Sequence, residues 1–299
     1  KVLNECKNFA GIGMTCEAGE NNPVLYDFLF ESVWQENAEV TAYPYDIDKW
    51  TEQYTERQYG GKSEKANAAW KILLNTVYKS ECNMLGRGAP ESIVNEWPDI
   101  GLVSASTWGN SLLGYSSEEL AVAEKLLSED EELLSESDGY KYDLVSIRQQ
   151  ILPNNALKCY NSLSKAYNEK NICDFKKYAS DFLSIADEMN TVTAENKYYS
   201  FSRYRDSVEE LTNNKDDFTK RIYGMSAKML ITTFGSYLMS ECGLHDYSNR
   251  QWSGLIDSFY KPRWEMFFEK CLKELSDIPT EKTDWFEWEW NKVRNGLFE

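Results

Sequence analysis

Glu17 is the side chain near the N-terminus whose surroundings best suit catalytic chemistry. It follows a short apolar stretch containing Gly11 and Gly13, and Pro23 can start a helix soon after it. A carboxylate between a strand and a helix is typical of the active-site end of a barrel strand. Most of such a barrel would then lie outside this chain. A solvent-exposed glutamate is the alternative, and Glu20 is a second carboxylate in the same segment.

Histidine and cysteine offer little catalytic or metal-binding chemistry in this sequence. The one histidine is His245, so a Ser-His-Asp triad or a site with several histidine ligands is disfavoured. We expect His245 to be an ordinary loop residue. The 7 cysteines form no CxxC pair, which argues against a zinc ribbon. We therefore expect no metal site.

The composition disfavours two classes of partner. A formal net charge of −17 argues against nucleic acid, because phosphate binding requires a cationic face. No apolar segment approaches the ~20 residues needed to span a bilayer. The 10 tryptophans and 19 tyrosines can fill a large core or stack on sugar rings, and packing is the expected role of most of them.

The apolar spacing predicts helices through nearly all of the chain after a short strand at Phe9–Gly13. The expected helix starts are Pro23, Asp46 or Asp48, Ser63, Ser116 paired with Glu119, and Asp174. Pro153 lies within a helical pattern that begins at Tyr142 and predicts a kink or a break, and Pro262 is expected to interrupt a later one. Residues 80–114 are rich in glycine and proline, which predicts a long irregular loop of a kind that often has a function.

Several blocks of the sequence, in the same order along the chain, resemble one known family. They are Gly11-Ile-Gly-Met-Thr-Cys-Glu17 with Asn22-Pro-Val-Leu-Tyr26, Trp50 with Arg57-Gln-Tyr59-Gly60, Ala69-Trp70 through Tyr78, Ser106-Thr-Trp108-Gly109, Tyr142-Asp143-Leu144-Val145 with Arg148-Gln149, Asp246-Tyr247 through Leu255, and Tyr260-Lys-Pro-Arg263-Trp264. Together they resemble the C-terminal part of the α-N-acetylglucosaminidases of glycoside hydrolase family 89. One block alone is a weak signal, whereas the ordered set is a strong one.

The resemblance implies a fold in two parts. Residues 1–40 would be the C-terminal end of a catalytic (β/α)8 barrel. Residues 41–299 would be an all-α domain that packs beside the active site. The expected fold class is therefore mainly α, a helical bundle or stack preceded by the last piece of a barrel, which agrees with the helical spacing.

The resemblance also implies a reaction. These enzymes are retaining exo-glycosidases that use two carboxyl groups, one as the nucleophile and one as the general acid/base. Glu17 falls on the nucleophile position of the family. The general acid/base would come from an upstream part of the barrel, so the chain by itself is expected to be inactive. The reaction requires no cofactor.

Three residues match positions that lie near the sugar in such enzymes. Phe234 occupies a position where the family usually has tryptophan, so its stacking surface would be smaller. Leu244 and Tyr247 follow, and Tyr247 could contact the sugar through its hydroxyl group. The sequence Glu96-Trp97-Pro98 replaces an Arg-Pro pair common in relatives, which puts the choice of substrate in doubt. Arg57 and Arg263 are expected to form structural ion pairs or to bind carbonyl groups.

The expected partners are a glycan with a terminal α-linked GlcNAc and the upstream barrel half of the same protein. The acidic surface favours neutral glycans over polyanionic ones. The family suggests an extracellular, periplasmic or lysosome-like compartment. The alternative is a non-catalytic helical module that binds glycan or protein, and a purely structural domain is a third hypothesis.

Overall fold

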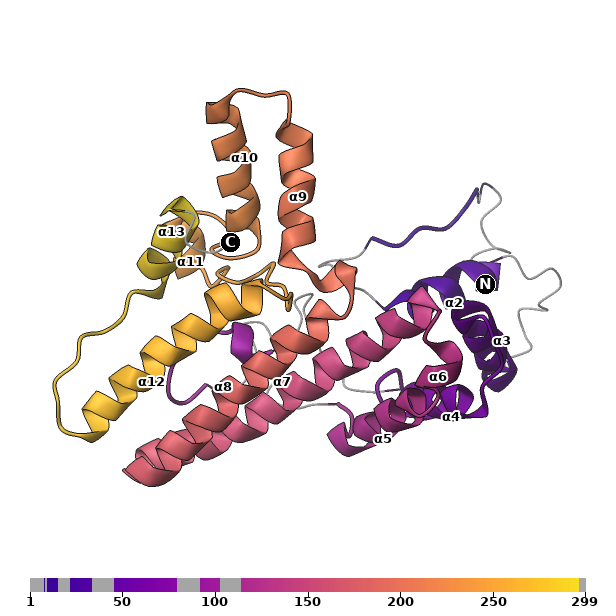
Figure 1. The fold of residues 1–299 in the computed structure, drawn as a ribbon, viewed down its shortest axis with the longest axis horizontal. Helices are drawn as coiled ribbons and strands as arrows, with labels where there is room; N and C mark the ends of the chain where they lie inside the picture. Colours follow the sequence, from indigo (N-terminus) through magenta and orange to yellow (C-terminus); the bar gives the residue numbers. More distant parts are fainter. Residues whose placement is uncertain are drawn as a thin grey trace.

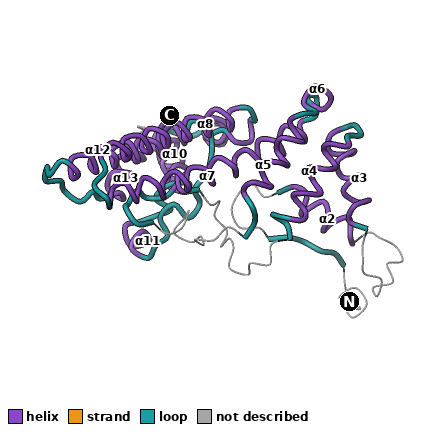
Figure 2. The backbone as a smooth tube through the Cα atoms, turned by 90° about the horizontal axis from the view of Figure 1, so that it is seen from below, coloured by secondary structure: helices purple, strands orange, loops and turns teal. Residues whose placement is uncertain are grey.

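The protein is built almost entirely of helices. The computed structural model describes residues 8, 10–15, 22–33, 46–79, 92–102 and 114–295. The elements in chain order are α2 (Pro23–Val33), α3 (Ile47–Tyr59), α4 (Glu64–Asn75), η1 (Ile93–Asn95), α5 (Ser117–Ser128), α6 (Glu131–Leu134), α7 (Asp138–Asn168), α8 (Ile172–Ala194), η2 (Lys197–Tyr199), α9 (Phe201–Thr212), α10 (Asp217–Leu230), α11 (Tyr237–Glu241), η3 (Ile256–Tyr260), α12 (Lys261–Leu275) and α13 (Trp285–Asn295). Within the described ranges there is no β-strand (Figure 2), and an isolated parallel bridge joins Ser200 to Ser253. The expected mainly α fold is confirmed.

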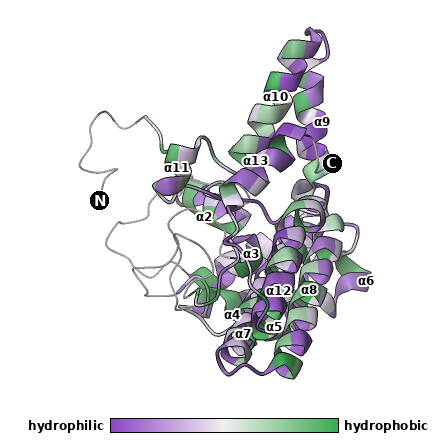
Figure 3. Ribbon diagram, turned by 90° about the vertical axis from the view of Figure 1, so that its left-hand side faces the viewer, coloured by the Kyte–Doolittle hydropathy of each residue, from purple (hydrophilic) through white to green (hydrophobic). Residues whose placement is uncertain are grey.

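Two long helices, α7 and α8, form the centre of the fold (Figure 1). Helix α12 packs along α8 on one side, and α3, α4 and α5 gather at the other end of α7. Helices α9 and α10 form a hairpin that projects from this body (Figure 3), and α10 has no buried residue. Helix α13 contacts α10 near the base of this hairpin (Figure 1).

Side-chain caps begin three of the described helices, α3, α4 and α5, at the expected residues Asp46, Ser63 and Ser116. Ser63 accepts a hydrogen bond from the amide of Ala66 at 2.8 Å, and Ser116 accepts one from the amide of Glu119 at 3.2 Å. The cap predicted at Asp174 is wrong. Asn171 caps α8 instead and accepts from the amide of Asp174 at 3.1 Å. Each bond satisfies an amide that the first turn of a helix leaves without a partner.

Neither of the two helix-interrupting prolines breaks a helix. Helix α7 continues through Pro153, so the predicted break is absent. Pro153 is buried, and α7 packs along its length against α8, which offsets the lost backbone hydrogen bond, a cost of about 3 kcal/mol. Pro262 lies in the first turn of α12, where a helix needs no amide donor, and therefore helps to start this helix after the π-helical η3.

Helix α7 joins two aromatic cores. The first lies between α7, α8, α12, η1 and η3, and its fully buried aromatic side chains include Tyr160, Phe175, Phe182, Phe259, Tyr260 and Trp264. The second lies between α3, α4, α5 and the start of α7, and contains Trp50, Tyr54, Tyr59, Trp70 and Tyr140. The expected core roles of Trp252, Tyr260 and Trp264 are confirmed. Arg57 pairs with Asp27 at 2.8 Å and with Glu31 at 2.9 Å, which links α3 to α2, as expected of a structural ion pair.

The N-terminal segment differs from its sequence-based prediction in its described part. Residues 10–15 are exposed and belong to no strand, so the strand expected at residues 9–13 does not form over residues 10–13. A barrel strand requires neighbouring strands to receive its hydrogen bonds, and the described ranges contain none. The boundary between a barrel end at 1–40 and a helical domain at 41–299 remains a prediction. Among the described helices, none combines the length and apolar character needed to cross a membrane.

Candidate functional site

The structure brings together the three residues expected to contact a sugar. The rings of Phe234 and Tyr247 lie 4.9 Å apart between centroids, at an angle of 50°. The amide of Tyr247 donates to the carbonyl of Leu244 at 3.3 Å, which places these two residues in one turn. All three side chains are partly exposed. Glu17, the expected catalytic residue, lies outside the described residues.

Backbone hydrogen bonds join the two segments that carry these side chains. The amide of Asp246 donates to the carbonyl of Thr232 at 3.1 Å, and the amide of Phe234 donates to the carbonyl of Met229 at 2.7 Å. Phe234 has φ +51° and Asp246 has φ +53°, a conformation that costs free energy for residues other than glycine. The segment after α10 and the 244–247 turn are therefore held together in an unusual local geometry.

A buried arginine lies behind this turn. Arg263 is fully buried on α12, and its Nη1 donates to Oδ2 of Asp246 at 2.9 Å. Its Nη2 donates to the carbonyl of Asn95 at 2.6 Å. The guanidinium also lies over the ring of Tyr260, 4.9 Å from the centroid. The expected structural role of Arg263 is confirmed.

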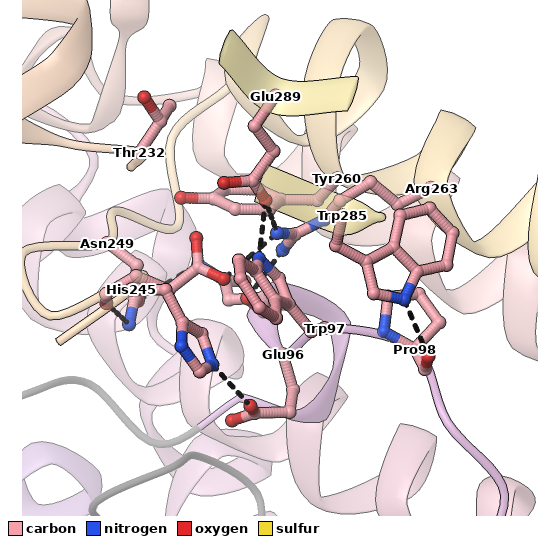
Figure 4. Close-up of polar contacts among 12 residues, drawn as sticks. Glu96, Trp97, Pro98, Thr232, His245, Asn249, Tyr260, Arg263, Trp285 and Glu289 are labelled. Atoms are coloured by element: carbon pink, nitrogen blue, oxygen red, sulfur yellow. Dashed lines mark hydrogen bonds and ion pairs between the residues drawn. The ribbon is translucent and has the colours of Figure 1, made fainter. Parts of the chain in front are cut away.

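A second carboxylate reaches the same guanidinium from α13. Oε1 of Glu289 accepts from Nη1 of Arg263 and also from the indole Nε1 of Trp97, the latter at 2.8 Å. Figure 4 shows Glu289, Arg263 and Trp97 converging from separate elements. Because Glu289 is fully buried, these bonds fix α13 against α12 and the segment after η1. The indole Nε1 of Trp285 donates a further hydrogen bond to the carbonyl of Pro98 at 3.0 Å.

His245 lies in a loop, as the sequence predicts, but its ring is packed against other side chains. Its ring stacks on Trp97, with 3.7 Å between centroids and an angle of 11°. Its Nε2 lies 3.7 Å from Oε1 of Glu96. Burial alone would lower the pKa of His245, but the interaction of its ring N–H with the Glu96 carboxylate and the charges of Asp246, Glu96 and Glu289 outweigh this effect, so the pKa of His245 is raised.

The buried cluster holds more carboxyl groups than one arginine can neutralise. Burial raises the pKa of Asp246 and the pKa of Glu289, and the charge of Arg263 opposes this effect only in part. The two carboxyl groups repel each other when both are ionised, so they titrate as a pair and retain one proton at a higher pH than a free carboxyl group would. The cluster is therefore a buried charged centre in which Asp246 and Glu289 both contact Arg263.

A cavity of about 750 Å³ opens beside the cluster. Its wall includes the stacked pair Trp97 and His245 together with Tyr237, Phe267, Trp285 and Phe286. A volume of this size falls within the range of small-molecule pockets. Across the described ranges, no three His, Cys, Asp or Glu side chains are grouped as the ligands of a metal ion would be.

Sequence reasoning missed the buried cluster and found only some of its members. Asp246 and Arg263 stand in the sequence blocks that carry the family resemblance, but nothing in the sequence pairs them with Glu289. Trp97 and Glu96 were noted only as departures from relatives. One signal in the sequence could have indicated the cluster. The segment at residues 285–290 is rich in tryptophan and also contains Glu289, and a carboxyl group that is buried when such a segment packs against the core requires a polar partner.

Known proteins resemble this chain over most of its length. The family model described as alpha-N-acetylglucosaminidase (NAGLU) C-terminal domain matches residues 50–296. Human alpha-N-acetylglucosaminidase is 24% identical over 272 residues, which cover 89% of this chain and 33% of the human protein.

Solved structures give the same result. A family 89 glycoside hydrolase from Clostridium perfringens, in complex with PUGNAc, superposes with a TM-score of 0.84 at 33% sequence identity. The match covers 91% of this chain and 30% of that one. A further structure from Clostridium perfringens, with the same TM-score of 0.84, holds GlcNAc-alpha-1,4-galactose, described as the substrate of that protein. The chain thus spans about a third of these relatives and belongs to the family of alpha-N-acetylglucosaminidase C-terminal domains.

Proposed function

We propose that this chain is the C-terminal portion of a retaining exo-glycosidase that releases terminal α-linked GlcNAc from glycans. The observation that carries the proposal is the match to the Clostridium perfringens protein, which covers 91% of this chain and which is described in complex with GlcNAc-alpha-1,4-galactose. The human relative, an alpha-N-acetylglucosaminidase, supports the same reaction. The net charge of −17 favours a neutral glycan over a polyanionic one.

Glu17 is the proposed nucleophile. Its carboxylate would attack the anomeric carbon and form a covalent glycosyl intermediate, which water then hydrolyses. The general acid/base would come from an upstream part of the protein and would lie about 5 Å from Glu17, the separation that retaining enzymes require. This division of the two carboxyl groups predicts that the 299-residue chain does not turn over substrate by itself.

Phe234, Leu244 and Tyr247 are the proposed contacts to the sugar from the helical domain. The partly exposed rings of Phe234 and Tyr247 offer an aromatic surface, and such surfaces pack against the apolar face of a sugar ring. Leu244 shares a turn with Tyr247 and adds an apolar contact. The helical domain would thus form one wall of the site, opposite the barrel that carries Glu17.

The test replaces Glu17 in the complete protein. Glu17→Gln keeps the size of the side chain but removes the nucleophile, so the release of GlcNAc from GlcNAc-α-1,4-galactose should fall by roughly 10⁴-fold. Glu20→Gln, a change of the same kind three residues later, is the matched control and should retain activity. Turnover near the wild-type rate by the Glu17 variant would refute the catalytic role. Glycan binding by the unmodified complete protein without any release would favour the non-catalytic module instead.

A further inference from the structure

The cluster around Arg263 connects three segments that are distant in the sequence. Its Nη1 donates to Asp246 in the 244–247 turn and to Glu289 on α13, and its Nη2 donates to the carbonyl of Asn95 in η1. The 244–247 turn carries two of the proposed sugar contacts, Leu244 and Tyr247. Arg263 therefore contacts the turn through Asp246, and none of its hydrogen bonds goes to a residue proposed to contact the sugar.

Stability alone is a weak reason for this arrangement. Moving an arginine and two carboxyl groups out of water costs several kcal/mol per ion, and apolar residues of similar volume often give equal stability. Arg263 and Glu289 are fully buried, so this cost is not reduced by exposure to solvent. The charged cluster provides directional hydrogen bonds, which an apolar core lacks, and these bonds fix the position of each partner.

The turn itself requires such a restraint. Four residues other than glycine have positive φ among those described. Lys170 and Asp277 lie just after the ends of α7 and α12, where this conformation is common. Phe234 and Asp246 instead lie at the proposed sugar site, joined through the bond from Asp246 to Thr232. Such a conformation is sparsely populated and persists only where surrounding contacts hold it.

The contacts that hold Asp246 come from few groups. Its carbonyl accepts from the amide of Asn249 at 3.0 Å and from the Asn249 side chain at 2.7 Å. Its carboxyl Oδ2 accepts from Arg263, whereas Oδ1 is buried and has no hydrogen-bond partner in the described part of the chain. Arg263 is therefore the side chain that ties the carboxyl group of the turn to the helical body.

We propose that Arg263 is a positioning residue, which holds the 244–247 turn through Asp246 while Glu289 fixes its guanidinium, and so places Leu244 and Tyr247 for the sugar. The identity of the ligand rests on the proposed function. The restraint on the turn does not, and it can be measured separately. Arg263 acts through Asp246, since it is fully buried behind the turn.

Hydrogen exchange of the backbone amides tests the restraint directly. In the complete protein near pH 6.5, Arg263→Met removes the guanidinium and keeps much of its volume. The amides of Asp246 and Asn249 should then exchange at least about tenfold faster, a change of about 1.4 kcal/mol in local opening. Glu289→Gln keeps an acceptor for Arg263 and should leave their exchange unchanged. Arg57→Met, which removes an exposed ion pair in the other core, is the control.

Kinetics show whether the restraint serves the sugar site. Misplacement of binding groups by about 1 Å can cost on the order of 100-fold in rate, so Arg263→Met should raise KM and lower kcat/KM by about 10- to 100-fold. A purely structural role would lower the melting temperature and leave KM unchanged.

The outcomes separate the two proposals. Wild-type exchange at Asp246 and Asn249 in Arg263→Met would overturn the positioning role, whatever the activity. Faster exchange in Arg263→Met, together with a wild-type protein that releases no GlcNAc, would uphold the restraint and refute the proposed function. If Arg263→Met does not fold, the triple variant with Asp246→Asn and Glu289→Gln removes both carboxylates that lose their cation, and the exchange of Asn249 then decides by the same criterion.

Discussion

Asp143 is the carboxyl group whose replacement should most clearly change how stability depends on pH. It lies in the second aromatic core, where its Oδ2 accepts from the Tyr59 hydroxyl at 2.9 Å, with the Tyr54 hydroxyl 3.5 Å away. Burial raises the pKa of Asp143 from its ordinary 3.8 to about 7, and the hydrogen bonds from Tyr59 and Tyr54 offset this only in part. The folded protein therefore binds this proton more tightly than the unfolded chain does.

The sign and size of the effect follow from the pKa of Asp143. Because the folded value is above the unfolded one, its contribution to the free energy of unfolding is complete below about pH 4 and is lost as the pH rises through about 7. Each unit of pKa shift is worth about 1.4 kcal/mol, so the loss amounts to at most about 4 kcal/mol. Asp143→Asn keeps a carbonyl acceptor for the two tyrosines and removes the proton equilibrium.

Urea unfolding, followed by tryptophan fluorescence at several values between pH 4.5 and 8, measures this contribution. The free energy of unfolding of the wild type, minus that of Asp143→Asn, should decrease by up to about 4 kcal/mol over the range. Asp181→Asn, an exposed replacement on α8, should show no such trend. A difference that is independent of pH, or that grows as the pH rises, would refute the reasoning.

Two further predictions concern the sugar site and the buried cluster. Phe234→Ala should raise KM for GlcNAc-terminated substrates by about 2- to 10-fold, since an aromatic contact is worth about 0.5–1.5 kcal/mol. Phe218→Ala on the exposed face of α10 should leave KM unchanged, and an equal KM in the two variants would show that Phe234 does not contact the sugar. Glu289 has a raised pKa because it is buried, so its contribution to stability is present at acid pH and is lost as the pH rises. Glu289→Gln should therefore gain in melting temperature relative to the wild type between pH 5 and 9, and a constant difference would show that Glu289 is ionised throughout.

Local sequence rules predicted the parts of the fold that depend on local contacts. The caps at Ser63 and Ser116 and the core tryptophan at 264 need only helical spacing and a capping side chain. The start of α8 was misplaced because Asn171 and Asp174 are both capping residues, three positions apart. Pro153 was expected to disturb α7, and the packing of α8 along that helix, which decides the outcome, is a tertiary effect.

The buried cluster could not be predicted from local rules because its members meet across long stretches of chain. His245 stacks on Trp97, although the two residues are far apart in the sequence. Glu289, on the last described helix, accepts a hydrogen bond from the same tryptophan. Periodicity reports which face of a helix is apolar and does not report which buried charges share a partner. The family resemblance predicts Phe234, Leu244 and Tyr247 as a group. In the structure the rings of Phe234 and Tyr247 are neighbours, and Leu244 shares a turn with Tyr247.

The most direct test of the account is a crystal structure of the complete protein with PUGNAc or a related GlcNAc analogue bound. The account predicts that a carboxyl oxygen of Glu17 lies about 3–3.5 Å from the anomeric carbon, the distance of a near-attack geometry. The sugar ring should also contact Phe234 and Tyr247. A Glu17 carboxylate that points into solvent, or a sugar bound away from these two aromatic residues, would contradict it.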